Sequence, residues 1–161
     1  MPPFQKILVA IDFSALNHDV IQTAAELCRR YEARATLLHV WEPELISVPE
    51  IHRLYDPKQL PGWTDKLMGR LERSRHDMQA EGALQIDLAL LDGNPSREIL
   101  RFAREGCFDL IVVGTHGRTG LAHALLGSVA EKVVRLSHCA VMTVHMSEAR
   151  AHAAADASIA T

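Results

Sequence analysis

The segment Lys6-Ile-Leu-Val-Ala-Ile-Asp12 is a short apolar run that ends in a charged residue. An uninterrupted apolar run of this length is typical of a strand that is buried on both faces of a parallel sheet. Apolar residues then recur at helical spacing over residues 20–31, with Ser14 as the predicted N-cap. A second β-rich run follows at residues 35–41, so the whole unit has the length of a βαβ crossover and predicts a parallel sheet.

The rest of the chain repeats this alternation of strand and helix. We predict helices over residues 63–81, 95–105 and 128–136, and strands over residues 84–91, 109–114 and 140–145. Residues 84–91 are apolar at every second position, which favours a half-exposed strand at the edge of the sheet. With the uninterrupted runs at the centre, the sequence predicts an α/β fold, a single doubly wound five-stranded parallel sheet in the order 3-2-1-4-5 with helices on both faces.

A sheet of this topology binds ligands where the chain reverses direction, which is here the point after Asp12 and Gly114.

Two segments do not fit the alternation of strands and helices. Residues 42–62 carry four prolines, which predict a long surface loop. The end of the chain is rich in alanine and lacks apolar periodicity, so we predict a folded domain over residues 1–146 and a disordered tail over residues 147–161.

Composition narrows the class of protein further. The chain of 161 residues carries 17 basic and 20 acidic residues, and no basic stripe stands out, so we expect no nucleic-acid partner. The longest apolar run, residues 7–11, is far shorter than the roughly 20 residues of a membrane-spanning helix, and the N-terminus lacks the pattern of a signal peptide. We therefore expect no membrane partner and a cytoplasmic location.

Three cysteines, Cys28, Cys107 and Cys139, are an odd number at wide spacing without any CxxC, which indicates neither a disulfide framework nor a zinc site. We expect them to be reduced and mostly buried. The nine histidines show no metal-binding spacing such as HExxH, so we predict no metal site.

The most unusual stretch begins where the fourth predicted strand ends, and reads Gly114-Thr-His-Gly-Arg-Thr-Gly-Leu-Ala-His-Ala-Leu-Leu-Gly-Ser128. Its pattern is G-x2-G-x9-G-S, built from Gly114, Gly117, Gly127 and Ser128. Glycine permits positive φ and close backbone approach, so consecutive amides can turn toward a phosphate. Gly127 and Ser128 open the next helix, whose free amides and positive dipole end add a second anion contact. The pattern therefore predicts binding of two or three linked phosphates.

Asp12 after the first strand, the G-x2-G-x9-G-S pattern and a closing Ser-x-Cys-x-Val resemble the universal stress protein family of the UspA type. The resemblance extends over residues 6–145 and is to the ATP-binding branch. It implies an adenine nucleotide alpha hydrolase-like fold, a regulatory role in the stress response, and a homodimer formed through the last strand, residues 140–144. It also implies ATP as the ligand, or ADP or AMP, with Mg or Mn only as a counter-ion of the nucleotide.

The resemblance further implies which residues bind the nucleotide. Those that match the family's adenosine contacts are Ala10, Asp12 and Val40; those that match its ribose and phosphate contacts are Gly114, Thr115, His116, Gly117, Arg118, Gly127, Ser128 and Val129. Two positions depart from the family pattern, because Ala10 and Ala140 stand where proline is common. We expect the adenine contact and the entry to the last strand to differ in detail, without loss of a phosphate donor.

Other interpretations of these residues stay open. Asp12 could serve only as a capping carboxylate, the glycines could merely build a tight loop, and Arg118 could be simply solvated. The sequence has neither G-x-S-x-G nor a P-loop lysine, so no catalytic residue is predicted. The function predicted is an ATP-binding regulatory module. The alternatives are a slow ATPase or other nucleotide-dependent enzyme on the same site, and a nucleotide-free dimeric interaction protein.

Overall fold

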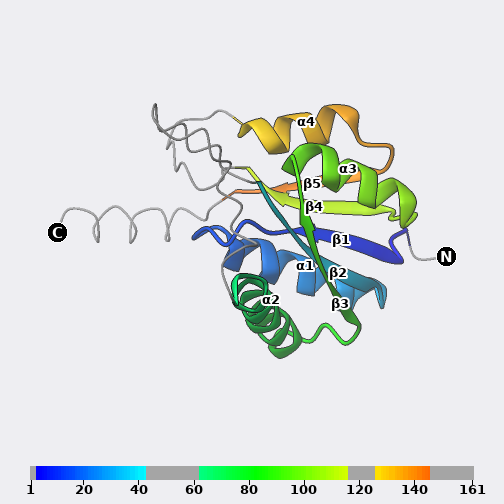
Figure 1. The fold of residues 1–161 in the computed structure, drawn as a ribbon. Helices are drawn as coiled ribbons and strands as arrows, with labels where there is room; N and C mark the ends of the chain where they lie inside the picture. Colours follow the sequence, from blue (N-terminus) through cyan, green and yellow to red (C-terminus); the bar gives the residue numbers. More distant parts are fainter. Residues whose placement is uncertain (1–2, 43–61, 116–125, 146–161) are drawn as a thin grey trace, which may run out of the picture.

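The computed structural model describes residues 3–42, 62–115 and 126–145. Strands and helices alternate through these ranges (Figure 1). The strands are β1 (Lys6–Ala10), β2 (Arg34–Trp41), β3 (Ile86–Asp92), β4 (Leu110–Gly114) and β5 (Ala140–Val144). The helices are α1 (Asn17–Tyr31), α2 (Trp63–Ala80), α3 (Pro95–Glu105) and α4 (Ser128–Leu136).

The five strands form one parallel sheet in the order β3-β2-β1-β4-β5, which confirms the predicted topology. The central strand β1 pairs with β2 on one side, where Val9 is opposite Leu37, and with β4 on the other, where Val9 is opposite Val112. All three of these residues are buried. Most β3 residues, in contrast, are only partly buried, as expected for a strand at the edge. The difference between uninterrupted and alternating apolar runs therefore reports strand position correctly.

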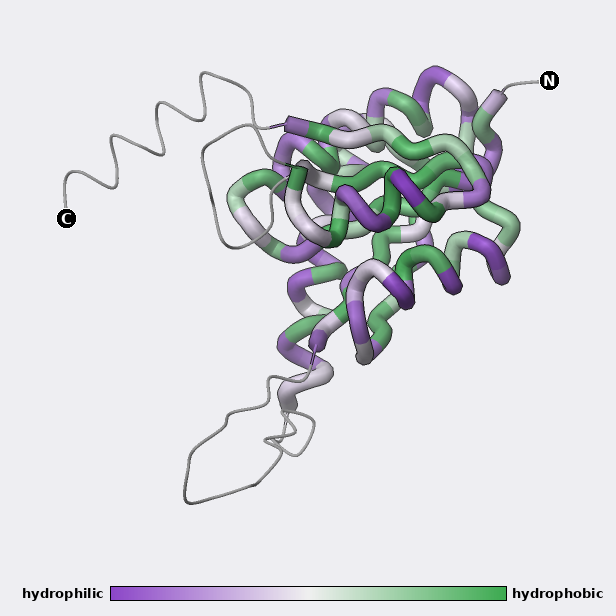
Figure 2. The backbone as a smooth tube through the Cα atoms, turned by 90° about the horizontal axis from the view of Figure 1, so that it is seen from above, coloured by the Kyte–Doolittle hydropathy of each residue, from purple (hydrophilic) through white to green (hydrophobic). Residues whose placement is uncertain are grey.

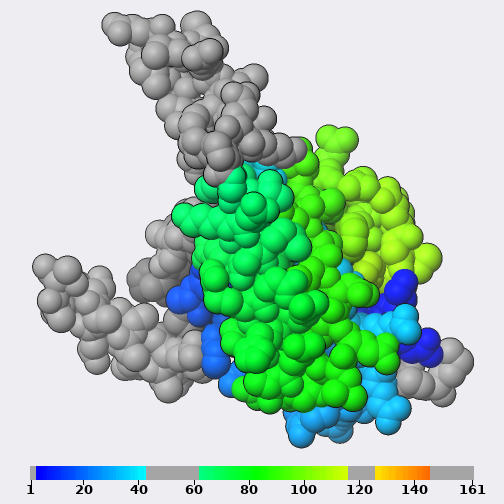
Figure 3. Space-filling view, turned by 60° about the horizontal axis from the view of Figure 1, so that its bottom comes forward, coloured from blue at the N-terminus to red at the C-terminus, as the bar shows by residue number. Residues whose placement is uncertain are grey.

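The sheet separates two layers of helices. Alternate residues of β1 point to opposite faces, so that Ile7 and Val9 belong to a core cluster with α1 and α2, while Leu8 and Ala10 belong to a second cluster with α3 and α4. Figure 1 shows the two helix pairs on either side of the sheet, and Figure 2 shows the hydrophobic stretches of the backbone gathered in the strands and on the inner sides of the helices. In Figure 3, α2 covers much of the face that comes forward.

Two local predictions are wrong. Ser14 is not the N-cap of α1, because the helix begins at Asn17 and its N-cap position is Leu16. The chain turns sharply before that point, since Phe13 has a left-handed backbone (φ +62°), and Ser14 is part of this turn. Cys107 is not a core thiol, because it is exposed in the turn between α3 and β4, where its own φ is +51°. Cys28 is buried as expected, and Cys139 is partly buried.

Most of the predicted proline-rich loop, residues 43–61, and the predicted tail, residues 147–161, lie outside the described residues. Within the ranges that the structure describes, none of the helices has the length and apolar character needed to span a membrane.

Candidate functional site

The carboxyl ends of β1 and β4 meet at the point where the chain reverses direction in the sheet. Ala10, the last residue of β1, is opposite Val113, the last residue but one of β4. From there the chain continues to α1 on one face and toward α4 on the other, so Asp12 and Gly114 lie on either side of the divergence. In Figure 1 these strand ends and the start of α4 lie on the same side of the molecule, at the left. Open α/β sheets bind ligands at such a divergence.

Asp12 orders the turn that follows β1. Its Oδ1 accepts a hydrogen bond from the amide of Ser14 at 2.9 Å, and its own amide donates to Oδ1 of Asn17 at 3.3 Å. Asp12 therefore orders the turn but does not cap α1, because the N-cap position of that helix is Leu16 and no described side chain caps it. The other oxygen, Oδ2, accepts no hydrogen bond from the described residues and can take a donor from a ligand.

Ser14 carries a second unused group in the same turn. Its Oγ atom is buried and has no hydrogen-bond partner among the described residues. A buried hydroxyl without a partner costs free energy unless a water or a ligand satisfies it. Asp12 and Ser14 together thus give the turn one free acceptor and one free hydroxyl.

Close packing against Leu16 explains why position 114 is a glycine. A Cβ atom at this position would lie 2.7 Å from Cδ2 of Leu16, at the start of α1. Positive φ among the described glycines occurs at Gly62, Gly82 and Gly93 only, and Gly127 has φ −59° and ψ 151°. Neither Gly114 nor Gly127 uses positive φ, and at Gly114 the missing side chain permits the close approach of Leu16.

Thr115 fixes the position of α4 at the end of β4. Its side chain and backbone are fully buried, and its amide donates to the carbonyl oxygen of Val144 at 2.9 Å. Its own carbonyl oxygen accepts from the amide of Gly127 at 2.6 Å. Gly127, the residue directly before α4, is thereby hydrogen-bonded to the residue that follows β4, and that residue is hydrogen-bonded to the end of β5.

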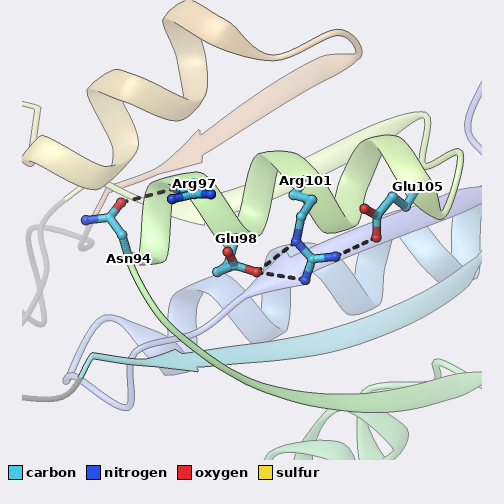
Figure 4. Close-up of polar contacts among 5 residues, drawn as sticks. All are labelled: Asn94, Arg97, Glu98, Arg101 and Glu105. Atoms are coloured by element: carbon cyan, nitrogen blue, oxygen red, sulfur yellow. Dashed lines mark hydrogen bonds and ion pairs between the residues drawn. The ribbon is translucent and has the colours of Figure 1, made fainter.

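Among the described residues, the start of α4, like the starts of α1 and α2, lacks the side-chain cap that the start of α3 has. At α3, Oδ1 of Asn94 accepts from the amide of Arg97 at 3.3 Å (Figure 4), and the proline and N-cap predicted there are confirmed. At α4 the N-cap is Gly127, and no described side chain caps the helix. The first-turn amides of a helix without a cap need another acceptor, and an anion provides it. The chemistry of this helix start thus fits a phosphate group.

The structure brings together the described members of the predicted site. Ala10, Asp12, Val40, Gly114 and Thr115 lie at or beyond neighbouring strand ends, and Gly127, Ser128 and Val129 lie at the start of α4. Ala10 and Val40 are buried in the core cluster beneath α3 and α4, whereas Ser128 is exposed. His116, Gly117 and Arg118 lie outside the described residues.

Sequence reasoning missed three residues beside Asp12. The ring of Phe13 contacts the His39 ring, with 4.3 Å between centroids, and the Arg70 guanidinium, whose central carbon is 4.1 Å from the Phe13 centroid. Arg70 Nη2 also donates to the carbonyl oxygen of Phe13 at 3.3 Å, and His39 Nδ1 lies 2.8 Å from that of Ile11. The available signal was weak: Arg70 sits between Leu67 and Leu71, beside the apolar stripe of α2.

Within the described ranges, no group of three or more His, Cys, Asp or Glu side chains is placed to hold a metal ion. The arrangement offers backbone amides, a carboxylate oxygen and a hydroxyl, which suit a ligand that combines an anion with sugar hydroxyls.

The model of the universal stress protein family matches residues 3–145 of this chain. Universal stress protein MJ0531 of Methanocaldococcus jannaschii is 48% identical over 143 residues, which cover 88% of this chain and 82% of that protein. Universal stress protein YxiE of Bacillus subtilis is 31% identical over 149 residues, which cover 88% of this chain and 99% of that protein. Among solved structures, protein MJ0577 is 26% identical with a TM-score of 0.75, and the match covers 90% of this chain and 98% of that one.

Proposed function

This chain belongs to the universal stress protein family, and on that premise we propose that it is an ATP-binding regulatory protein of the stress response. The nucleotide binds where β1 and β4 diverge, with ADP or AMP as further ligands and Mg or Mn only as a counter-ion. Nucleotide occupancy changes the surface that the protein presents to a partner.

The observation that carries this proposal is the start of α4. Its first-turn amides have no side-chain cap among the described residues, and the hydrogen bond from Gly127 to Thr115 fixes the helix start beside the strand ends. The helix dipole adds partial positive charge at the same place. A net charge of −3 does not oppose such binding, because these donors act locally.

Related proteins supply the class of ligand. Solved structures of a universal stress protein with cAMP, of one from Archaeoglobus fulgidus with dAMP, and of a family member from Arabidopsis thaliana with AMP share this fold, with TM-scores of 0.69, 0.65 and 0.57. Their ligands have in common an adenine base, a pentose and a phosphate. The proposed donors of this chain, the amides of Ser128 and Val129 and the Ser128 hydroxyl, fit the phosphate.

Within the proposed site each group has a role. The amides of Ser128 and Val129 donate to a phosphate, and the Ser128 hydroxyl adds a donor. Asp12 Oδ2 accepts from a ribose hydroxyl, and Ala10 and Val40 lie beneath the adenosine. Gly114 and Thr115 hold the strand end in place, and we extend the phosphate contacts to His116, Gly117 and Arg118 on the family pattern.

The sequence provides no P-loop lysine, which favours a sensor of nucleotide over a catalyst of its hydrolysis. We further propose that the protein works in the cytoplasm as a homodimer, formed through the edge of β5. This strand is the last in the sheet, and its outer edge has no neighbour among the described residues. An unpaired edge of this kind is a template for a strand of a second chain.

Isothermal titration with ATP, ADP, AMP and cAMP tests the nucleotide proposal. We expect binding of at least one of them, and at least tenfold weaker binding by Gly127→Val, whose side chain would occupy the phosphate position. The backbone of Gly127, at φ −59° and ψ 151°, is one that valine adopts, so the variant folds without strain there. Ser128→Ala removes only the hydroxyl and is expected to weaken binding about threefold.

The matched control is Asn94→Ala, which removes the cap of α3 and lowers stability without touching the site. Its affinity should equal that of the wild type. Absence of binding to all four nucleotides at millimolar concentration would contradict the proposal, as would unchanged affinity in Gly127→Val. Mass analysis of any ligand that copurifies with the protein would identify the physiological nucleotide.

A further inference from the structure

Phe13 adopts a backbone conformation that residues with a branched or bulky side chain rarely take. Its φ of +62° is in the left-handed region, directly after Asp12. The turn needs this conformation, because it lets the amide of Ser14 return to Oδ1 of Asp12 at 2.9 Å. A non-glycine residue stays in this region only when its surroundings hold it there.

The surroundings that hold Phe13 come from two other elements. Arg70 of α2 places its guanidinium over the Phe13 ring at 4.1 Å and donates through Nη2 to the Phe13 carbonyl oxygen at 3.3 Å. His39 of β2 contacts the same ring, with 4.3 Å between centroids, and its Nδ1 lies 2.8 Å from the carbonyl oxygen of Ile11. Both the ring and the backbone of Phe13 are therefore fixed from outside the turn.

We propose that Arg70 is a positioning residue of the nucleotide site, which acts by holding Phe13 in its left-handed conformation and thereby aiming the Asp12 carboxylate and the Ser14 hydroxyl at the ligand. The inference rests on the proposed function. It assigns α2 a part in binding, although no residue of α2 belongs to the predicted site.

An indirect role of Arg70, through Phe13, can be distinguished by experiment from direct binding of the phosphate by Arg70. Its guanidinium interacts with the Phe13 ring and carbonyl group, so its effect on the ligand passes through the backbone at position 13. Glycine adopts positive φ without cost. A glycine at position 13 should therefore make Arg70 dispensable for binding, whereas a direct contact between Arg70 and the ligand would remain important.

The experiment measures nucleotide affinity by isothermal titration for the wild type, Arg70→Gln, Phe13→Gly, Phe13→Ala and the double variant Arg70→Gln/Phe13→Gly. We expect Arg70→Gln and Phe13→Ala each to bind about tenfold more weakly, because each loses support for the turn and keeps the unfavourable φ. Phe13→Gly and the double variant are expected to bind within about threefold of the wild type.

The matched control is Arg73→Gln, which neutralises an exposed arginine three residues further along α2 and should bind as the wild type does. Stability measurements separate positioning from a purely structural role. Phe13→Gly loses the contacts of the ring and should be less stable than the wild type, yet it should keep its affinity. Hydrogen exchange of the Ser14 amide should accelerate in Arg70→Gln without nucleotide.

The outcomes distinguish a failure of the proposed nucleotide binding from a failure of the proposed role of Arg70. Absence of nucleotide binding by the wild type would overturn the proposed function and this inference together. If the wild type binds, equal affinity of Arg70→Gln and the wild type would overturn the inference alone. A loss of affinity on Arg70→Gln that is as large in the Phe13→Gly background would also overturn it, since it would place Arg70 in direct contact with the ligand.

Discussion

The amide of Gly127 donates a 2.6 Å hydrogen bond to the carbonyl oxygen of Thr115, twelve residues earlier in the chain. This bond connects the first residue after β4 with the residue that precedes α4. Because Thr115 is fully buried and its own amide donates to Val144, the start of α4 is anchored to the two strands at this side of the sheet. The helix start that we propose for phosphate binding is thus held by the backbone itself.

Gly127→Pro should isolate the energetic value of that bond. Proline accepts the φ of −59° found at position 127 but has no amide hydrogen, so the carbonyl oxygen of Thr115 would lose its donor. A hydrogen bond of this kind contributes about 0.5–1.5 kcal/mol, and we expect the free energy of unfolding in urea to fall by about that amount relative to Gly127→Ala. The alanine variant keeps the amide, so equal stability of the two variants would show that the bond contributes nothing.

Gly114 and Leu16 should be energetically coupled. A Cβ at position 114 would lie 2.7 Å from Cδ2 of Leu16, so Gly114→Ala is expected to destabilise by about 1–3 kcal/mol through overpacking. Leu16→Ala removes a buried side chain and should cost about 2–5 kcal/mol. In the double variant the added methyl group occupies the space that the leucine leaves, so its loss of stability should be smaller than the sum. Additive losses would mean that the glycine serves some purpose other than packing.

The sheet order and most element boundaries could be predicted because they depend on burial, which local apolar patterns report. The uninterrupted runs became the three central strands and the alternating run became the edge strand β3. The start of α3 could be predicted equally well, since Asn94 caps the helix and Pro95 suits its first position.

The turn after β1 could not be predicted, because its conformation is set from a distance. Phe13 gives no sign of a left-handed backbone in the sequence, and the side chain that supports it, Arg70, is 57 residues further along the chain. The glycine pattern has a similar ambiguity. The sequence motif singles out Gly114, but only the folded structure shows that the neighbour it accommodates is Leu16.

Lysine at position 140 should weaken the proposed homodimer. Ala140 is exposed at the start of β5, and a charged side chain on an edge strand disfavours pairing with another edge. We expect sedimentation velocity to show a dimer for the wild type at micromolar concentration and a larger monomer fraction for Ala140→Lys. The matched control is Asp87→Lys, at an exposed position on the opposite edge strand β3. If Asp87→Lys dissociates the dimer and Ala140→Lys does not, the interface lies on β3.

The Cys28 thiol should make stability depend on pH in the alkaline range. Burial raises the pKa of Cys28 from 9.0 to about 11, because the thiolate is poorly solvated in the core cluster beneath α1. Below pH 9 the thiol is protonated in both the folded and the unfolded state, so it contributes no pH dependence. Between pH 9 and pH 11 the unfolded state releases the proton first, and the folded state loses stability as pH rises.

Urea denaturation of the wild type and Cys28→Ala at pH 8 and pH 10 measures this effect. The difference in the free energy of unfolding between the two proteins should shift by about 1 kcal/mol against the wild type over that interval. Iodoacetamide at pH 8 provides an independent readout by mass spectrometry, with Cys107→Ser as the control that removes the exposed thiol. Cys107 should be alkylated in the native protein and Cys28 only when urea is present. Rapid native alkylation of Cys28 would show that the core around this thiol opens readily, whereas an unchanged difference in stability between pH 8 and pH 10 would contradict the predicted pH dependence.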